Sequence, residues 1–249
     1  MKQTMTTSLM IGALLCVLTA QSAQAAIALD RTRVIYDGSQ KSLSLNISNE
    51  NKQLPYLAQG WIEDMQGNKI TSPLTVLPPI QRVEPGAKSQ VKVQGLPAAS
   101  ALPQDRESLF YFNLREIPPR TDKPNTLQIA LQTRIKLFYR PKVLMTASGD
   151  TPWQEKITLS KQGDSYVVNN PTPYFVTLVD GRSKVKGKSL KDFDPLMVEP
   201  KGQGTLKTSA TALGNSPVLT YINDYGGRPQ LQFNCSGGNC TATPVKDSH

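Results

Sequence analysis

Residues suited to catalysis or metal binding are scarce in this chain of 249 residues. The one histidine is His249, the last residue, and chain ends tend to fray. A Ser–His–Asp or Cys–His site needs an internal histidine, and catalytic zinc sites usually take histidine ligands. Paired carboxylates stay possible, but the 19 acidic residues are scattered. We therefore predict no catalytic residues, no metal, no cofactor and no small-molecule substrate.

The cysteines point to a structural bond. Cys235 and Cys240 enclose Ser-Gly-Gly-Asn, a turn-prone stretch between two extended segments. In an exported protein these two residues are expected to form a disulfide, the alternative being two free thiols. So small a loop stabilises the fold by only about 2 kcal/mol in the chain-entropy model.

Residues 1–25 have the pattern of a secretory signal peptide. Lys2 precedes the apolar run Leu9–Leu18, and Ala23-Gln24-Ala25 fits the small-x-small cleavage pattern. A membrane anchor is the alternative, but the run is about half of the ~20 residues that span a bilayer. We predict cleavage after Ala25 and export of the rest of the chain.

The elements that must position any site are short extended runs. Thr126–Leu137 alternates apolar and polar residues, with Leu127, Ile129 and Leu131 at period two. The other strand candidates are Ser42–Ser48, Ser89–Val93, Tyr166–Val168, Tyr174–Val179, Val218–Ile222 and Pro229–Phe233. Period two with frequent Gly, Pro and Asn is typical of all-β sandwiches, and no convincing helical run occurs.

The length suits two domains of ~100 residues each. Alternation stops at Arg140–Thr151, where small and polar residues gather. We therefore predict an N-terminal domain over residues 26–143 and a C-terminal domain over residues 144–249.

The second half carries a run of basic residues, which we interpret as a solvated loop. Its members are Arg182, Lys184, Lys186, Lys188 and Lys191. The run lacks the interleaved aromatic residues on which bases stack. Because the chain is also expected to be exported, we do not expect nucleic acid as a partner.

A long motif, Leu102–Pro118 (LPQDRESLFYFNLREIP), resembles the signature of the periplasmic pilus-assembly chaperones. Further similar segments follow in order along the chain: Leu29–Arg33, Asn51–Gln59, Leu131–Pro141, Asn170–Tyr174 and Tyr221–Pro229. The short segment Pro119–Asn125 resembles the short-loop subclass, which serves adhesive rod-type pili.

This resemblance implies two immunoglobulin-like β-sandwiches at an angle, with a cleft between them. Family members are not enzymes: they bind pilin subunits entering the periplasm and deliver them to an outer-membrane usher. The family also suggests a dimer of the free chaperone that hides its donor strand. The alternative is an exported structural pilus or adhesin β-domain, which would be one shorter domain without its own last strand.

In the family mechanism a pilin lacks its final strand, and the chaperone lends one. Leu127, Ile129 and Leu131 resemble the donor residues and would project on one face of the segment Thr126–Leu131. The residues by themselves favour an alternative, in which the three face the chain's own core. The resemblance favours donation.

Arg33 and Lys136 resemble the family's anchor for the C-terminal carboxylate of the pilin. The alternative is two solvated charges. Lys136 is even-numbered whereas the donor residues are odd-numbered. Strict alternation therefore places Lys136 on the opposite face of the strand from the donor residues. Either a bulge lies between Gln132 and Lys136, or the carboxylate approaches from the other side of the strand.

Glu107, Arg140 and Asp224 resemble a charge network between the domains. Removing one member of such a buried network can cost ~3–5 kcal/mol. The alternative is that Glu107 and Asp224 are a catalytic pair. An intervening arginine suits ion pairing better than acid–base chemistry.

Overall fold

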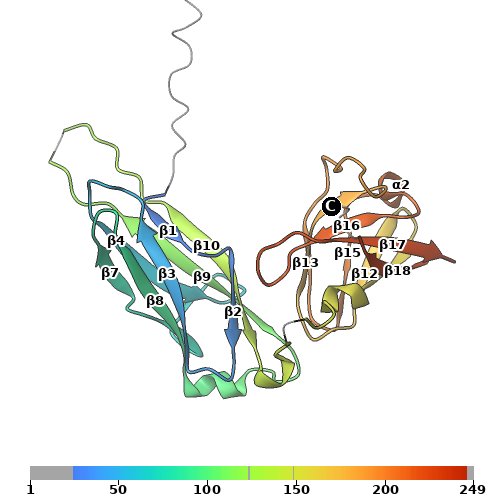
Figure 1. Cartoon of the computed structure of the whole chain (residues 1–249), viewed down its shortest axis with the longest axis horizontal. Coiled ribbons are helices and arrows are strands. Elements are labelled where there is room, and N and C mark those ends of the chain that lie inside the picture. The colour runs from blue at the N-terminus through green and yellow to red at the C-terminus, as the bar shows by residue number, and fades with distance from the viewer. Residues whose placement is uncertain (1–24, 123, 148, 246–249) are drawn as a thin grey trace, which may run out of the picture.

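The computed structural model describes residues 25–122, 124–147 and 149–245. The predicted signal peptide, apart from Ala25, and His249 lie outside the described residues. The described chain consists mostly of strands, which form two bodies, one from each half of the sequence (Figure 1). No helix in the described ranges is long and apolar enough to cross a membrane. The predicted all-β class is confirmed.

The first body is a sandwich of two sheets around one core. One sheet has the order β1-β3-β8-β6, and the other has the order β2-β10-β9-β4-β5 with β7 paired to β4. Its elements are β1 (Ile27–Leu29), β2 (Arg33–Asp37), β3 (Ser42–Asn49), β4 (Tyr56–Glu63), β5 (Lys69–Ile70), β6 (Leu74–Leu77), β7 (Ile80–Val83), β8 (Lys88–Gly95), the short 3-10 helix η1 (Pro97–Ala101), β9 (Ser108–Ile117) and β10 (Gln132–Arg140).

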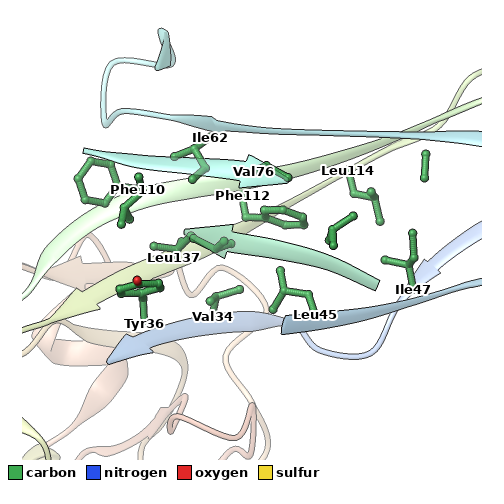
Figure 2. Close-up of a cluster of buried hydrophobic side chains, with 14 of the residues drawn as sticks. Val34, Tyr36, Leu45, Ile47, Ile62, Val76, Phe110, Phe112, Leu114 and Leu137 are labelled. Carbon is green, nitrogen blue, oxygen red and sulfur yellow. The ribbon is translucent and has the colours of Figure 1, made fainter. Parts of the chain in front are cut away.

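Alternating residues build this core. In β3, Leu45 and Ile47 are buried, whereas Ser44 and Asn46 are exposed. Figure 2 shows side chains from both sheets meeting between the layers, with Leu137 of β10 among them. Full burial of each such side chain contributes roughly 1.5–3 kcal/mol. Because Leu137 points into the core, the residues on either side of it in β10 point outward.

The second body forms one eight-stranded sheet around a second core, in the order β14-β13-β16-β17-β18-β11-β12-β15. Its strands are β11 (Thr158–Gln162), β12 (Ser165–Asn170), β13 (Val176–Arg182), β14 (Leu196–Val198), β15 (Gly202–Thr205), β16 (Val218–Tyr221), β17 (Gln230–Ser236) and β18 (Asn239–Pro244). The 3-10 helices η2 (Lys142–Leu144) and η3 (Trp153–Lys156) precede it, and the helix α2 (Ala210–Leu213) lies before β16.

The predicted disulfide is confirmed. Cys235 and Cys240 lie opposite each other in the β17–β18 hairpin and are bonded. Gly237 and Gly238 form the turn with φ of 59° and 87°, the left-handed values that a two-residue hairpin of this hand needs. The disulfide therefore closes a hairpin whose register is already set by its turn.

The two bodies meet through a small apolar cluster separate from both cores. It contains Leu109 of β9, Phe138 of β10 and Phe175, which directly precedes β13. The ring centroids of Phe138 and Phe175 lie 5.6 Å apart. This contact holds the outer face of β10 against the second body.

Candidate functional site

β10 has one edge that is only half occupied. On one side it pairs with β9 from Gln132 to Tyr139. On the other it pairs in parallel with β2, from Lys136 opposite Arg33 onward. Before Arg33 the chain belongs to β1, which pairs with β3 in the other sheet. Among the described residues, the edge of β10 before Lys136 therefore has no strand partner.

The segment before β10 differs from its predicted structure. We predicted a strand over Thr126–Leu137, but β10 begins at Gln132. The partner strand β9 ends at Ile117, and Pro118 and Pro119, which lack an N–H, follow it. The last ladder contact runs from Glu116 N to Leu131 O at 3.0 Å. Residues 126–131 thus extend past the end of their own sheet.

The three apolar residues of this segment are exposed. Leu127 has 84% of its surface exposed, Ile129 has 63% and Leu131 has 39%. The alternative that they face the chain's own core is therefore wrong. Large apolar side chains in a row on an unpaired segment are unusual in a soluble protein and indicate an interaction site.

The register of β10 settles where Lys136 points. Pairing with β9 is unbroken from Gln132 to Tyr139, so no bulge lies between Gln132 and Lys136. Leu137 and Tyr139 are in the core. Lys136 therefore lies on the outer face, toward the C-terminal sandwich, and the bulge that we considered is excluded.

Arg33 and Lys136 are neighbours across the β2–β10 pair. Arg33 Nη1 donates to the carbonyl oxygen of Ile222 at 3.2 Å, and Lys136 Nζ donates to Thr177 Oγ1 at 3.4 Å. Neither cation belongs to an ion pair found within the described ranges. Arg33 Nε is buried without a hydrogen-bond partner. Both cations are thus held by neutral groups and keep unused donor capacity.

Burial destabilises the charged forms of Arg33 and Lys136 relative to their neutral forms. Burial, with the nearby charge of Arg33, lowers the pKa of Lys136 to about 8. Burial also lowers the pKa of Arg33, although Asp224 and Glu107 oppose the shift. A carboxylate placed between these cations would relieve their repulsion and restore the pKa of Lys136.

The predicted residues Glu107, Arg140 and Asp224 come together beside this pair. Arg140 is 2% exposed, and its Nε donates to Glu107 Oε1 at 2.8 Å. Its two terminal nitrogens donate to the two oxygens of Asp224 at 2.7 and 3.0 Å. Glu107 Oε2 accepts from the backbone N–H of Phe175 at 2.8 Å. Burial raises the pKa of Glu107, opposed by the charge of Arg140.

Two aromatic residues of this cluster were missed by the sequence reasoning. The Arg140 guanidinium lies 4.8 Å from the ring centre of Trp153 and 5.0 Å from that of Tyr174. Both rings belong to the C-terminal body, and their centroids are 4.4 Å apart. Tyr174 lay within the similar segment Asn170–Tyr174, whereas no sequence signal marked Trp153. Arg140 is therefore held by two carboxylates and two rings from four parts of the chain.

A cavity of 410 Å³ opens beside Arg33 where the two bodies meet. It is lined by Arg31, Thr32, Arg33, Ile35, Arg140, Met145, Thr146, Asp224 and Tyr225. The residues after β16 close one side of it, since a Cβ on Gly226 would lie 2.7 Å from Thr32 Oγ1. The site thus combines an exposed apolar segment, an open strand edge and a polar cleft lined by positively charged side chains.

Two family models together match most of this chain. Residues 26–145 match the N-terminal domain of the PapD pili and flagellar-assembly chaperones, and residues 152–233 match the PapD C-terminal domain. The chain therefore belongs to the pilus-assembly chaperone family. The family role is that of a chaperone, and its fold is a pair of immunoglobulin-like sandwiches.

Individual relatives agree along nearly the whole chain. The probable fimbrial chaperone YfcS of Escherichia coli K12 is 54% identical over 228 residues, 92% of this chain and 90% of the relative. The chaperone protein PapD of Escherichia coli is 53% identical over 225 residues, 90% of this chain and 92% of the relative.

Solved structures show the same architecture. The periplasmic chaperone SfaE is 31% identical with a TM-score of 0.65, over 83% of this chain and 98% of the solved chain. The YadV chaperone is 32% identical with a TM-score of 0.64, over 88% of this chain and 100% of the solved chain. The SafB chaperone of Salmonella enterica adds support for the fold. It is 24% identical with a TM-score of 0.67, over 90% of this chain and 98% of the solved chain.

Proposed function

We propose that this periplasmic chaperone holds a pilin subunit at two points. Residues 126–131 lend a strand to the pilin, with Leu127, Ile129 and Leu131 filling its groove. Arg33 and Lys136 bind the C-terminal carboxylate of the same pilin. The observation that carries the proposal is the exposed apolar segment beside an edge of β10 that is open within the described part of the chain. That edge ends at two cations, for which the described residues supply no anionic partner.

The open edge and the charges together set the direction of the added strand. A pilin strand lying beside β10 in line with β2 would end where Arg33 begins. If it runs parallel to β10, its carboxyl end reaches Arg33 and Lys136. If it ran antiparallel, an amino end or an uncharged stretch would meet the cations. Charge therefore favours the parallel arrangement of a C-terminal strand.

The proposed groove contact at Ile129 and the proposed carboxylate contact at Lys136 lie at different places along the same extended segment of the chaperone. Ile129 and Lys136 are seven residues apart, roughly 23 Å in extended chain. Lys136 lies on the outer face, and the donor residues continue the alternation of Leu137. A pilin strand gripped at both points has a fixed register, because a shift of one residue would misplace either its carboxylate or its groove.

The network of Glu107, Arg140 and Asp224 serves in this proposal to keep the two bodies in place around the cleft. Glu107 and Arg140 belong to the proposed N-terminal domain (26–143), and Asp224 to the C-terminal domain (144–249). Arg140 ties them with three charge-assisted hydrogen bonds. The cations at Arg33 and Lys136 then keep their contacts with Ile222 and Thr177.

Two further steps complete the proposal. After export through a signal peptide over residues 1–25, the chaperone delivers its pilin to an outer-membrane usher. SafB, which has a similar fold, was solved in complex with the SafA pilin.

The free chaperone also hides its apolar segment in a self-capping dimer. Sedimentation at increasing concentration should show a dimer that Ile129→Asp reduces to a monomer.

Co-purification from the periplasm tests the proposal. Wild-type protein should carry a stoichiometric pilin-type subunit, and Arg33→Ala or Lys136→Ala should lose it while keeping the wild-type melting temperature. Arg31→Ala, beside the cleft but paired with Asp30 at 2.7 Å, is the matched control and should retain the subunit. Retention by both site variants would refute the anchor.

A further inference from the structure

One loop of the C-terminal sandwich carries positive charge that the proposed chaperone site does not use. It joins β13 to β14 and is called here the lysine loop, after Lys184, Lys186, Lys188 and Lys191. All four side chains are exposed. None of the four belongs to an ion pair that the described part of the chain forms.

The acidic residues around the loop neutralise little of this charge. Asp180 accepts from Arg182 Nε at 3.1 Å and from Ser189 Oγ at 2.9 Å, so it is already occupied. Asp194, beyond the last lysine, pairs with Lys207 at 2.6 Å. Asp192 is the remaining acidic residue of the loop. A net positive charge is left on the exposed side.

The loop is folded, so the four charges are displayed together. Leu190 N donates to Gly181 O at 3.0 Å, and Gly187 N donates to Lys184 O at 3.0 Å. Leu190 and Phe193 pack against the second core. Gly181 leaves room for this anchor, because a Cβ there would lie 2.5 Å from the Phe193 ring. The apolar side chains thus point inward and the lysines outward.

The chemistry of the loop fits a diffuse anionic surface. Lysine ammonium groups are mobile point charges without the forked geometry by which arginine reads single carboxylates. Protein interfaces depend on buried apolar or aromatic anchors. None of the exposed large hydrophobic residues found in the described ranges lies in this loop. We propose that the lysine loop binds the anionic phospholipid surface of a membrane, reversibly and without insertion.

The position of the loop leaves the cleft open. β13 begins beside the cleft, where Thr177 contacts Lys136, and ends at Arg182. Five residues of strand separate Thr177 from Arg182, about 17 Å. A chaperone attached through the lysine loop could therefore still hold a pilin. The proposal does not depend on the strand-donation mechanism.

Vesicle sedimentation of the mature protein tests the proposal. The vesicles consist of phosphatidylcholine alone or of phosphatidylcholine mixed with phosphatidylglycerol. Each lysine near an anionic surface contributes about fivefold in partitioning at low ionic strength. Binding is expected only to the mixed vesicles, and it should vanish at about 1 M salt, where the screening length falls to about 3 Å.

Two variants with equal net charge separate the loop from the overall charge. The loop variant carries Lys184→Gln, Lys186→Gln, Lys188→Gln and Lys191→Gln. The control variant carries Lys41→Gln, Lys52→Gln, Lys88→Gln and Lys92→Gln, four exposed lysines of the N-terminal sandwich. The loop variant should lose more than tenfold in partitioning, while the control stays within about threefold of wild type. Equal melting temperatures verify that both variants fold.

Three results would overturn the proposal. Wild-type protein that ignores the mixed vesicles at low salt would refute lipid binding. Equal losses in both variants would assign the attraction to net charge rather than to the loop. Crosslinking of the loop to an acidic protein, without vesicle binding, would show that its partner is a protein.

Discussion

Ile129→Ala tests the donor segment with little disturbance of the fold. Ile129 is 63% exposed and lies outside the strands, so its truncation should change the free energy of unfolding by less than about 0.5 kcal/mol. In a pilin groove the same side chain would be buried, and the three carbons removed are worth about 0.8 kcal/mol each. Pilin affinity should therefore fall by about 2 kcal/mol, or roughly thirtyfold.

The assay compares the dissociation rate of a preformed chaperone–pilin complex in excess competitor with the melting temperature of the free chaperone. Gln128→Ala is the matched control, because Gln128 lies on the opposite face and its Nε2 donates to Pro119 O at 2.6 Å. Dissociation should be about thirtyfold faster for Ile129→Ala and nearly unchanged for Gln128→Ala. Equal rates in both variants would refute the reasoning, as would a fall in melting temperature typical of a core truncation.

Three further changes have defined outcomes. Because the pKa of Lys136 is lowered to about 8, affinity for a pilin C-terminal peptide should fall as the pH rises through 8, and titrations of Lys136→Arg should show no such fall. Glu107→Ala removes one partner of buried Arg140 and should lower the free energy of unfolding in urea by ~3–5 kcal/mol; wild-type stability would contradict the network. Cys235→Ala with Cys240→Ala should cost only about 2 kcal/mol in the same assay, and loss of folding would contradict that estimate.

Some of the strands were predictable because alternation reports burial directly, whereas others, such as β4 and β9, were not among the predicted strands. Ser42–Ser48 was predicted from Leu43, Leu45 and Ile47, and β3 covers it with one more residue. The disulfide was predictable because the chain is expected to be exported and because the turn-prone Ser-Gly-Gly-Asn stretch between Cys235 and Cys240 places them opposite each other in a hairpin.

The start of β10 was not predictable from alternation alone. Apolar and polar residues alternate as regularly in residues 126–131 as in the residues that follow. A strand also needs a partner strand, however, and β9 ends at Ile117. Alternation therefore identified apolar residues on one face without showing whether their face was covered. The free edge of β10 depends on the chain crossing between sheets before Arg33, which no local pattern reports.

The contacts around the cations were also beyond the sequence. Arg33 donates to the backbone carbonyl of Ile222, and every residue type carries such an oxygen. Trp153 reaches Arg140 from a stretch without a motif. These contacts join segments that are distant in sequence, so they follow from the packing of the two bodies.

Titration of a peptide copied from the C-terminal strand of a co-purified pilin tests the central claim most directly. The peptide is prepared with a free carboxylate or with an amide, and each form is titrated into wild-type protein and Lys136→Ala. The account predicts that amidation weakens binding to wild type by at least tenfold. It predicts a clearly smaller loss in Lys136→Ala, where Arg33 is the remaining cation of the pair that can bind the carboxylate. Equal binding of the two peptides to wild-type protein would contradict the account.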